Sequence, residues 1–165
     1  DLILEYTLAY HNINYTTGFY GQELSSFNTD LFNQKKRIVN IIKVHGSLDW
    51  FDIGDGNIRQ SSNKEFVDKY IPTIITPGKN KYRMAYEEPY RDLIQQSDEM
   101  IKKADCFLAV GFGFNDEHLT PKIKEKTKNG TPIVLITKKI TDTTILELKN
   151  ASKYALLEES VIFSN

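Results

Sequence analysis

A histidine followed by a glycine is the pair of residues in this chain best suited to chemistry. His45 and Gly46 stand in the segment KVHGSLDW, after the β-branched run at residues 38–44. A neutral imidazole near pH 7 accepts a proton from a sugar hydroxyl or from water, and the glycine keeps the neighbouring backbone clear of a substrate. The alternative is a histidine that makes only a structural hydrogen bond at the end of a strand. The segment alone is compatible with both.

The second segment suited to chemistry is ADCFLAVGFGFNDEHL, residues 104–119, in which an apolar run of strand length leads into a turn with two glycines. Gly111 and Gly113 free the backbone to turn, and Asn115 or Asp116 can cap the helix that follows. Backbone amides at such a helix start hold a phosphate or a ribose, because glycine has no Cβ to block the approach. Any strand-to-helix turn of an α/β domain can use the same residues, so ligand binding is one of two interpretations.

Charge and cysteine content narrow the class of protein. With 21 basic and 22 acidic side chains, the chain lacks the charge excess typical of a nucleic-acid or membrane surface, so we expect a small-molecule ligand. The single cysteine, Cys106, lies in an apolar run, which predicts a reduced thiol in the core and neither a disulfide framework nor a zinc ribbon. No apolar run approaches the roughly 20 residues of a membrane span and no leader is visible, which predicts a cytoplasmic protein.

The elements that must position the two segments alternate between strand and helix. Helices are predicted at residues 1–12, 66–70, 88–103, 117–128 and 142–152, the first of them capped by Asp1. Strands are predicted at residues 38–44, 73–76, 106–110, 132–137 and 160–164. Polar connections are expected at residues 21–34 and 79–87. A hairpin is predicted after His45, with strands at residues 50–53 and 57–60 around the turn Gly54-Asp55-Gly56.

This alternation predicts the fold class. Strand, helix, strand, helix along the second half of the chain is typical of an α/β, Rossmann-like fold, with a mainly parallel sheet and helices on both of its faces. The hairpin is then a small insertion after His45, at the carboxyl edge where ligands bind in such folds. No linker or repeat is apparent, so we expect a single domain over residues 1–165.

Together, KVHGSLDW and ADCFLAVGFGFNDEHL resemble the paired signatures of the sirtuin-like domains of bacterial anti-phage defence proteins. The stretches DLILEY, IITPGKNKYR and EEPYRDLI are similar to further parts of that family, so the resemblance covers nearly the whole chain. It implies an enzyme that binds NAD⁺ as its substrate, uses no metal, and hydrolyses the bond between nicotinamide and ribose to release ADP-ribose. The implied biological role is depletion of NAD⁺ during phage infection, by a homo-oligomer or with a defence partner protein.

The resemblance also assigns roles to residues. His45, in the HG motif, is implied to be catalytic. The glycine turn is implied to hold the ribose and phosphate side of the dinucleotide, and the strand that ends at Thr137 to lie beside the adenosine. The implied binding residues are Gly46, Gly111, Phe112, Gly113, Asn115, Asp116, which can instead cap the helix, and Thr137, with Lys138 next to it.

Residues near the two motifs are given other roles. Trp50 is expected to pack in the core or the hairpin, and Asp49 to be a solvated carboxylate at the hairpin edge. His11 is expected to face solvent, while His118 either contacts the ligand or packs.

Two departures from the family pattern define the alternatives. Deacetylating sirtuins carry a four-cysteine zinc module soon after the histidine, whereas this chain has only Cys106, so protein deacetylation is not expected. The family's first glycine-rich loop and catalytic asparagine would precede Asp1, so we expect the carboxyl portion of a larger enzyme, inactive by itself. A non-catalytic module that senses NAD⁺ or ADP-ribose is the main alternative, and a structural domain without a ligand is another.

Overall fold

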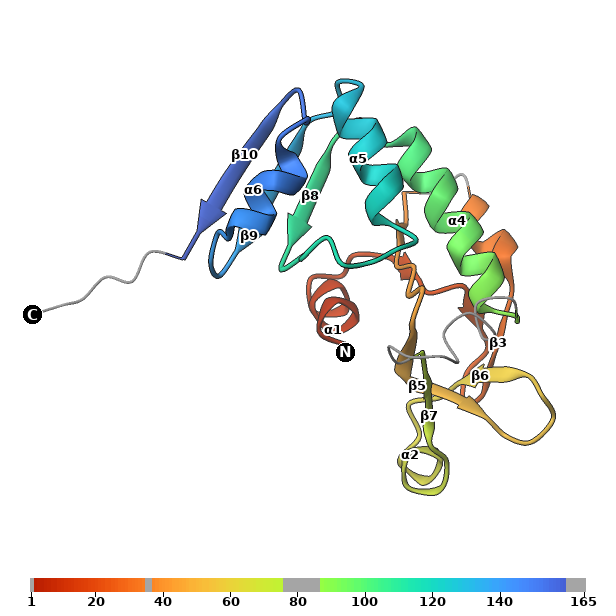
Figure 1. Cartoon of the computed structure of the whole chain (residues 1–165). Helices are drawn as coiled ribbons and strands as arrows, with labels where there is room; N and C mark the ends of the chain where they lie inside the picture. The colour runs from red at the N-terminus through yellow and green to blue at the C-terminus, as the bar shows by residue number, and fades with distance from the viewer. Residues whose placement is uncertain (1, 35–36, 76–86, 160–165) are drawn as a thin grey trace, which may run out of the picture. The chain divides into compact units, whose positions relative to one another are not determined.

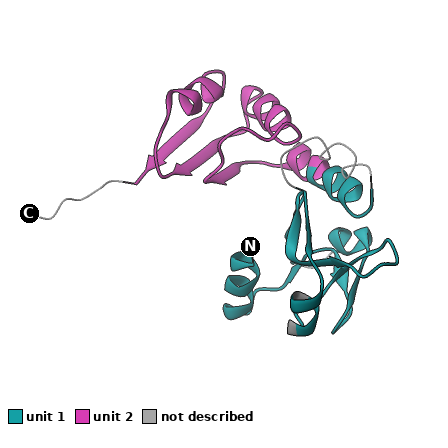
Figure 2. Ribbon diagram, turned by 60° about the horizontal axis from the view of Figure 1, so that its bottom comes forward, with its two compact units in different colours: residues 1–97 teal, residues 98–165 magenta. Residues whose placement is uncertain are grey.

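The computed structural model describes residues 2–34, 37–75 and 87–159. The chain divides into two units, residues 1–97 and residues 98–165, which are coloured separately in Figure 2. Helix α4 (Tyr90–Lys103) runs through the boundary between them. Three predictions fall outside the described residues: the Asp1 cap, the loop at residues 79–87 except for its last residue, and the strand at residues 160–164.

A five-stranded antiparallel sheet forms the centre of unit 1, with the strand order β2-β3-β6-β5-β7 (Figure 1). Its strands are β2 (Phe19–Tyr20), β3 (Ser25–Phe27), β5 (Gly46–Asp52), β6 (Ile58–Gln60) and β7 (Pro72–Ile74). The other elements of the unit are α1 (Ile3–Tyr10), β1 (Tyr15–Thr16), the 3₁₀ helix η1 (Thr29–Asn33), β4 (Val39–Asn40), α2 (Lys64–Lys69) and the first residues of α4. The predicted hairpin is confirmed as β5 and β6, and it belongs to a larger sheet than expected.

Large side chains fill the core of unit 1. Trp50, Tyr90 and Leu93 are at most 2% exposed, and Phe32 and Ile75 complete the buried cluster. The prediction that Trp50 packs in the core is therefore confirmed. Burial of an aromatic ring of this size is among the largest single contributions that a side chain makes to stability.

Two predictions for unit 1 are wrong. The strand expected at residues 38–44 shrinks to Val39–Asn40, because its parallel partner β1 is itself only two residues long, and the chain turns at Val44 and His45. The polar connection expected at residues 21–34 contains β3 and η1. Both errors have one cause: strands of two or three residues depend on long-range pairing, which a local pattern does not report.

Three parallel strands form the sheet of unit 2, in the order β10-β9-β8. They are β8 (Phe107–Val110), β9 (Ile133–Thr137) and β10 (Tyr154–Glu158), joined through the helices α5 (Thr120–Lys128) and α6 (Asp142–Leu148) (Figure 1). The α/β, Rossmann-like class with parallel sheets is confirmed. Strand β10 was not predicted, although the sequence YALLE carries three aliphatic residues in succession.

Among the described residues, one face of the unit 2 sheet is buried in a core and the other is not, whereas helices were expected on both faces. Ile133 and Leu135 on that face pack with Phe114 and Leu148. The opposite face exposes Leu108 and Val110 at 68% each, Leu157 at 52% and Ile136 at 38%. When parallel strands are added in one direction, right-handed crossovers place every connecting helix on the same side of the sheet.

The alternation of exposed and buried residues in β8 also corrects one prediction about its flank. Cys106, expected in the core, is an exposed free thiol just before the strand begins. None of the helices within the described ranges has the length and apolar character needed to cross a membrane.

Candidate functional site

His45 lies in a tight turn between β4 and β5 whose backbone is held on both sides. The Gly46 N–H donates to the Lys43 carbonyl at 3.1 Å, which closes the turn, and the Ile75 N–H donates to the His45 carbonyl at 2.9 Å. The residue is half-buried. The structure thus fixes the main chain of His45 through its neighbours in unit 1.

Gly46 is required at its position by the strand that runs beside it. Its φ is +86°, in the left-handed region, and a Cβ placed on it would lie 2.2 Å from the carbonyl oxygen of Thr73. No side chain fits against a backbone oxygen at that distance. We expected a glycine here because it leaves clearance for a substrate. The close approach of β7 is a second reason for this glycine.

Asp49 is not the solvated carboxylate that the sequence predicted. It is 8% exposed, and its Oδ2 accepts a hydrogen bond of 2.6 Å from Gln60 Nε2. Gln60 Oε1 in turn accepts from the Thr17 hydroxyl at 3.0 Å, so the carboxylate belongs to a polar network inside unit 1. Ser47 and Asp49 share one buried face of β5, a placement that their polar residue types do not indicate.

The glycine turn of unit 2 follows β8 and has open space beside its first glycine. Gly111 has a φ of +63°, and a Cβ placed there would meet no atom of the described residues within 4 Å. The Gly111 N–H donates to the Ile136 carbonyl at 2.9 Å, which anchors the turn to β9. Phe114 also has a positive φ, 57°, and its ring packs edge-on against Phe112 with centroids 4.8 Å apart.

Asp116 caps the helical turn that leads into α5. Its Oδ1 accepts the backbone N–H groups of His118 at 2.8 Å and of Leu119 at 2.9 Å. Two of the amides that a helix start offers to an anion are therefore bonded to the protein's own carboxylate. This favours a sugar over a phosphate as the group that approaches this end of the turn.

Several of the predicted binding residues of unit 2 line two separate cavities. The first, of about 380 Å³, lies at the carboxyl ends of the three parallel strands and brings Gly111 together with Thr137 and Lys138. The second, of about 360 Å³, brings Asn115 together with Asp116. Phe112 packs against the core of the unit, and Gly113 lies beside the side chain of Asn115, whose Nδ2 would be 3.0 Å from a Cβ at that glycine.

Glu158 is a residue at the first cavity that the sequence analysis missed. It ends β10 and lines the space beside Thr137, and its Oε1 accepts the Ile140 N–H at 2.8 Å. The missed strand is the reason, since a carboxylate at the end of an unrecognised strand has no predicted place in the sheet. His45 and Gly46 belong to unit 1, and the other predicted residues belong to unit 2.

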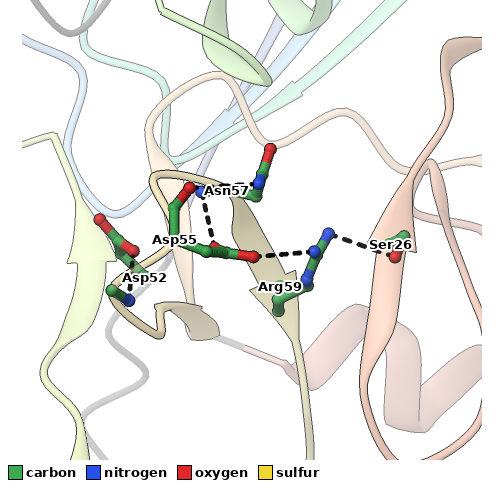
Figure 3. Close-up of polar contacts among 6 residues, drawn as sticks. Ser26, Asp52, Asp55, Asn57 and Arg59 are labelled. Carbon is green, nitrogen blue, oxygen red and sulfur yellow. Dashed lines mark hydrogen bonds and ion pairs between the residues drawn. The ribbon is translucent and has the colours of Figure 1, made fainter.

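Unit 1 contains a further cavity, of about 550 Å³, next to the hairpin of β5 and β6. Arg59 lines it, donating to Asp55 Oδ2 at 3.0 Å and to Ser26 Oγ at 3.3 Å (Figure 3). The backbone N–H of Asn57 is the main cause of the lowered pKa of the Asp55 carboxyl, and the positive charge of Arg59 lowers the pKa further. Turn residues and Arg59 were predicted here only as parts of a hairpin.

The sequence and the fold were compared with those of known proteins. A family model described as the SIR2-like domain matches residues 1–160. The chain belongs to the SIR2-like domain family. A solved structure described as "Structural Basis for the Mechanism and Regulation of Sir2 Enzymes" is similar to this SIR2-like chain at 17% identity, with a TM-score of 0.47. The similarity covers 78% of this chain and 53% of that one, so the chain spans about half the length of that protein. No curated protein matches the sequence.

Proposed function

We propose that this SIR2-like chain is part of an enzyme that hydrolyses NAD⁺ to nicotinamide and ADP-ribose. Water adds to C1′ of the ribose, the bond from C1′ to the nicotinamide nitrogen breaks with its electron pair leaving on nicotinamide, and one proton is released. Nicotinamide departs as a neutral ring, so the site must orient the sugar and the water more than it must protonate the leaving group. One fixed imidazole suits that task.

The observation that carries the proposal is the held turn of His45. Its carbonyl accepts from Ile75, the residue after β7, and the Gly46 N–H closes the turn, which limits the places that the imidazole can reach. We propose that His45 accepts a proton from a ribose hydroxyl or from the attacking water, as a general base does. Membership of the SIR2-like family supports NAD⁺ as the substrate class.

We further propose that the glycine turn and the carboxyl-edge cavity of unit 2 contact the ADP-ribose part. The open space beside Gly111 and the cavity at Thr137 support this assignment. The proposed set of binding residues is completed by Gly46, Phe112, Gly113, Asn115 and Asp116. Asp116 contributes by capping the helical turn that leads into α5. The same proposal has four further parts. Residues 1–165 form one sirtuin-like domain, and the protein acts as a homo-oligomer or with a defence partner. It is cytoplasmic, and it depletes NAD⁺ in anti-phage defence.

The test measures nicotinamide released from NAD⁺ by the full-length protein and by His45→Ala. General acid-base catalysis contributes about 10²–10⁴-fold, so we expect the variant to lose that much of the rate. His11→Ala is the matched control, since His11 is an exposed histidine of unit 1, and it should keep the rate of the unaltered protein.

Calorimetric titration with ADP-ribose distinguishes the alternatives. Unchanged ADP-ribose affinity in His45→Ala, together with the lost rate, would establish a catalytic role. Binding of NAD⁺ by the unaltered protein without release of nicotinamide under activating conditions would instead identify a sensor. If neither NAD⁺ nor ADP-ribose shifts the melting temperature, the chain is a structural domain.

A further inference from the structure

Helix α1 turns its apolar residues outward and its one acidic residue inward. Ile3, Tyr6 and Tyr10 are 70%, 69% and 83% exposed, whereas Glu5 is 6% exposed and is the buried residue of the helix. Leu8 is the one apolar residue of α1 that is half-buried, so burial of an apolar face contributes little to the position of this helix. Burying a carboxylate costs free energy unless a cation pairs with it, so the position of α1 depends on the partner of Glu5.

That partner is Lys43. The Lys43 ammonium forms an ion pair with Glu5 Oε1, and the two side chains are 13% and 8% exposed. Lys43 Nζ also donates to Ser47 Oγ at 2.8 Å, and Ser47 is 2% exposed. We name these three residues, Glu5, Lys43 and Ser47, the Glu5 clamp.

Two residues of the Glu5 clamp flank His45 in the chain. Lys43 precedes the histidine by two residues and Ser47 follows it by two, so the bond between their side chains spans the turn from one side to the other. On the main chain, the Gly46 N–H and the Lys43 carbonyl close the same turn. A change in the position of Lys43 would therefore shift both ends of the turn that carries His45.

The phenol of Tyr15 lies near the same carboxylates. Burial raises the pKa of its hydroxyl, and the nearby carboxylates of Glu5 and Asp49 raise the pKa further. Two carboxylates thus act on one phenol of β1, and the clamp connects α1 with the segment that holds His45. Lys43 is the cation that the structure pairs with Glu5.

We propose that Glu5 is a positioning residue, which acts through Lys43 and Ser47 to fix the His45 turn for hydrolysis. The inference rests on the proposed function of His45. It goes beyond stabilisation, because a buried ion pair contributes little net stability compared with apolar residues of the same size, whereas it can select one conformation.

The first test is Glu5→Gln in the full-length protein, with nicotinamide release and ADP-ribose binding measured separately. A small displacement of a catalytic group costs about 10²-fold in rate, so we expect kcat to fall by about 10- to 100-fold while the Kd for ADP-ribose changes by less than about twofold. Glu65→Gln is the matched control, since Glu65 is an exposed glutamate in the first turn of α2, and it should change neither value.

A second variant separates positioning from folding. In Glu5→Leu/Lys43→Met the buried charges are replaced by apolar side chains of similar size, a change that often leaves stability unaltered or raised. We expect this variant to melt at or near the temperature of the unaltered protein and to keep the lowered kcat. An unaltered kcat in this variant would overturn the proposal.

A third measurement does not need activity. NMR spectra of the imidazole groups should show the His45 signals broadened or doubled in Glu5→Gln, while those of His118, in unit 2, stay as they were. If the unaltered protein releases no nicotinamide, the proposed function fails. These spectra still test whether the Glu5 clamp positions His45. Unchanged His45 signals would show that Glu5 does not position it.

Discussion

The two units use a left-handed glycine in opposite ways. At Gly46, in unit 1, the space where a side chain would stand is filled by the carbonyl oxygen of Thr73, 2.2 Å from the place of a Cβ. At Gly111, in unit 2, the corresponding space holds no atom of the described part of the chain within 4 Å. The first glycine is thus explained by the protein's own packing, while the second leaves room at the carboxyl edge of a parallel sheet, where ligands of such folds bind.

The two cores also differ, in the polar groups buried with the core of unit 1 and in the exposed sheet face beside the core of unit 2. In unit 1 the cluster around Trp50 is accompanied by buried polar groups, Glu5, Ser47 and Asp49 among them. In unit 2 the cluster around Leu135 packs only one face of the sheet. The histidine turn is thus held by packing within unit 1, whereas the glycine turn has open space beside Gly111 among the described residues.

The largest expected effects come from emptying one core at a time. Trp50→Ala removes a fully buried indole and should cost about 3–5 kcal/mol, and Leu135→Ala about 2–5 kcal/mol. Amide hydrogen exchange on the full chain should show that Trp50→Ala weakens protection in β5 and β6 while β8–β10 keep theirs, with the reverse for Leu135→Ala. Equal loss in both units for both variants would mean that they unfold as one.

An alanine at each of the two glycines sharpens the comparison directly. Gly46→Ala combines a strained backbone with a steric clash and should lower the free energy of unfolding by about 2–4 kcal/mol. Gly111→Ala meets only the backbone strain, about 1–2 kcal/mol. Urea denaturation measures both, and the comparison fails if Gly111→Ala is the more damaging. Under the proposed function, Gly111→Ala also weakens binding of ADP-ribose, because its methyl group enters the open space.

The smallest expected effect concerns the hairpin of unit 1. The pKa of Asp55 lies below its ordinary value of 3.8, chiefly because the Asn57 N–H donates to the carboxylate, so the ionised form stabilises the fold. That contribution is present above pH 3.8 and is lost as the pH falls through the lower, folded-state pKa. Asp55→Asn should therefore lower the urea midpoint slightly at pH 7 and not at the acid end.

Asp68→Asn, at an exposed aspartate of α2, serves as the control for the pH series. A difference between Asp55→Asn and the unaltered protein that persists unchanged to the acid end would contradict the assignment of the pH dependence to this carboxylate.

Local chemistry made part of the fold predictable. The turn Gly54-Asp55-Gly56 specified its hairpin, and the apolar runs specified β8 and β9, because turn residues and strand-length apolar segments act within a few positions of themselves. Helix α4 followed from its helical spacing. Elements that depend on distant partners were predicted less well: β1 was missed, the run at residues 38–44 yields only the two residues of β4, and β10 was missed despite its aliphatic residues.

The candidate site was predictable in its residues and not in its surroundings. His45, Gly46 and the glycine turn stand out by residue type, whereas the burial of Glu5 and Asp49 does not, because both are acidic residues in segments with apolar neighbours. Residue type alone would place Ile3 and Tyr6 of α1 in a core, yet both are exposed. The difference arises from an ion pair with Lys43, which is 38 positions further along the chain.

The uncovered face of the β8–β10 sheet has a practical consequence for anyone who handles the protein. Leu108, Val110 and Leu157 are each at least half exposed, and within the described part of the chain β8 and β10 each pair on one edge only. Adjacent apolar side chains beside open strand edges promote growth of sheets between molecules. Concentrated samples of residues 98–165 alone should therefore scatter light before samples of the whole chain do, and a charged side chain at Leu108 should delay that onset.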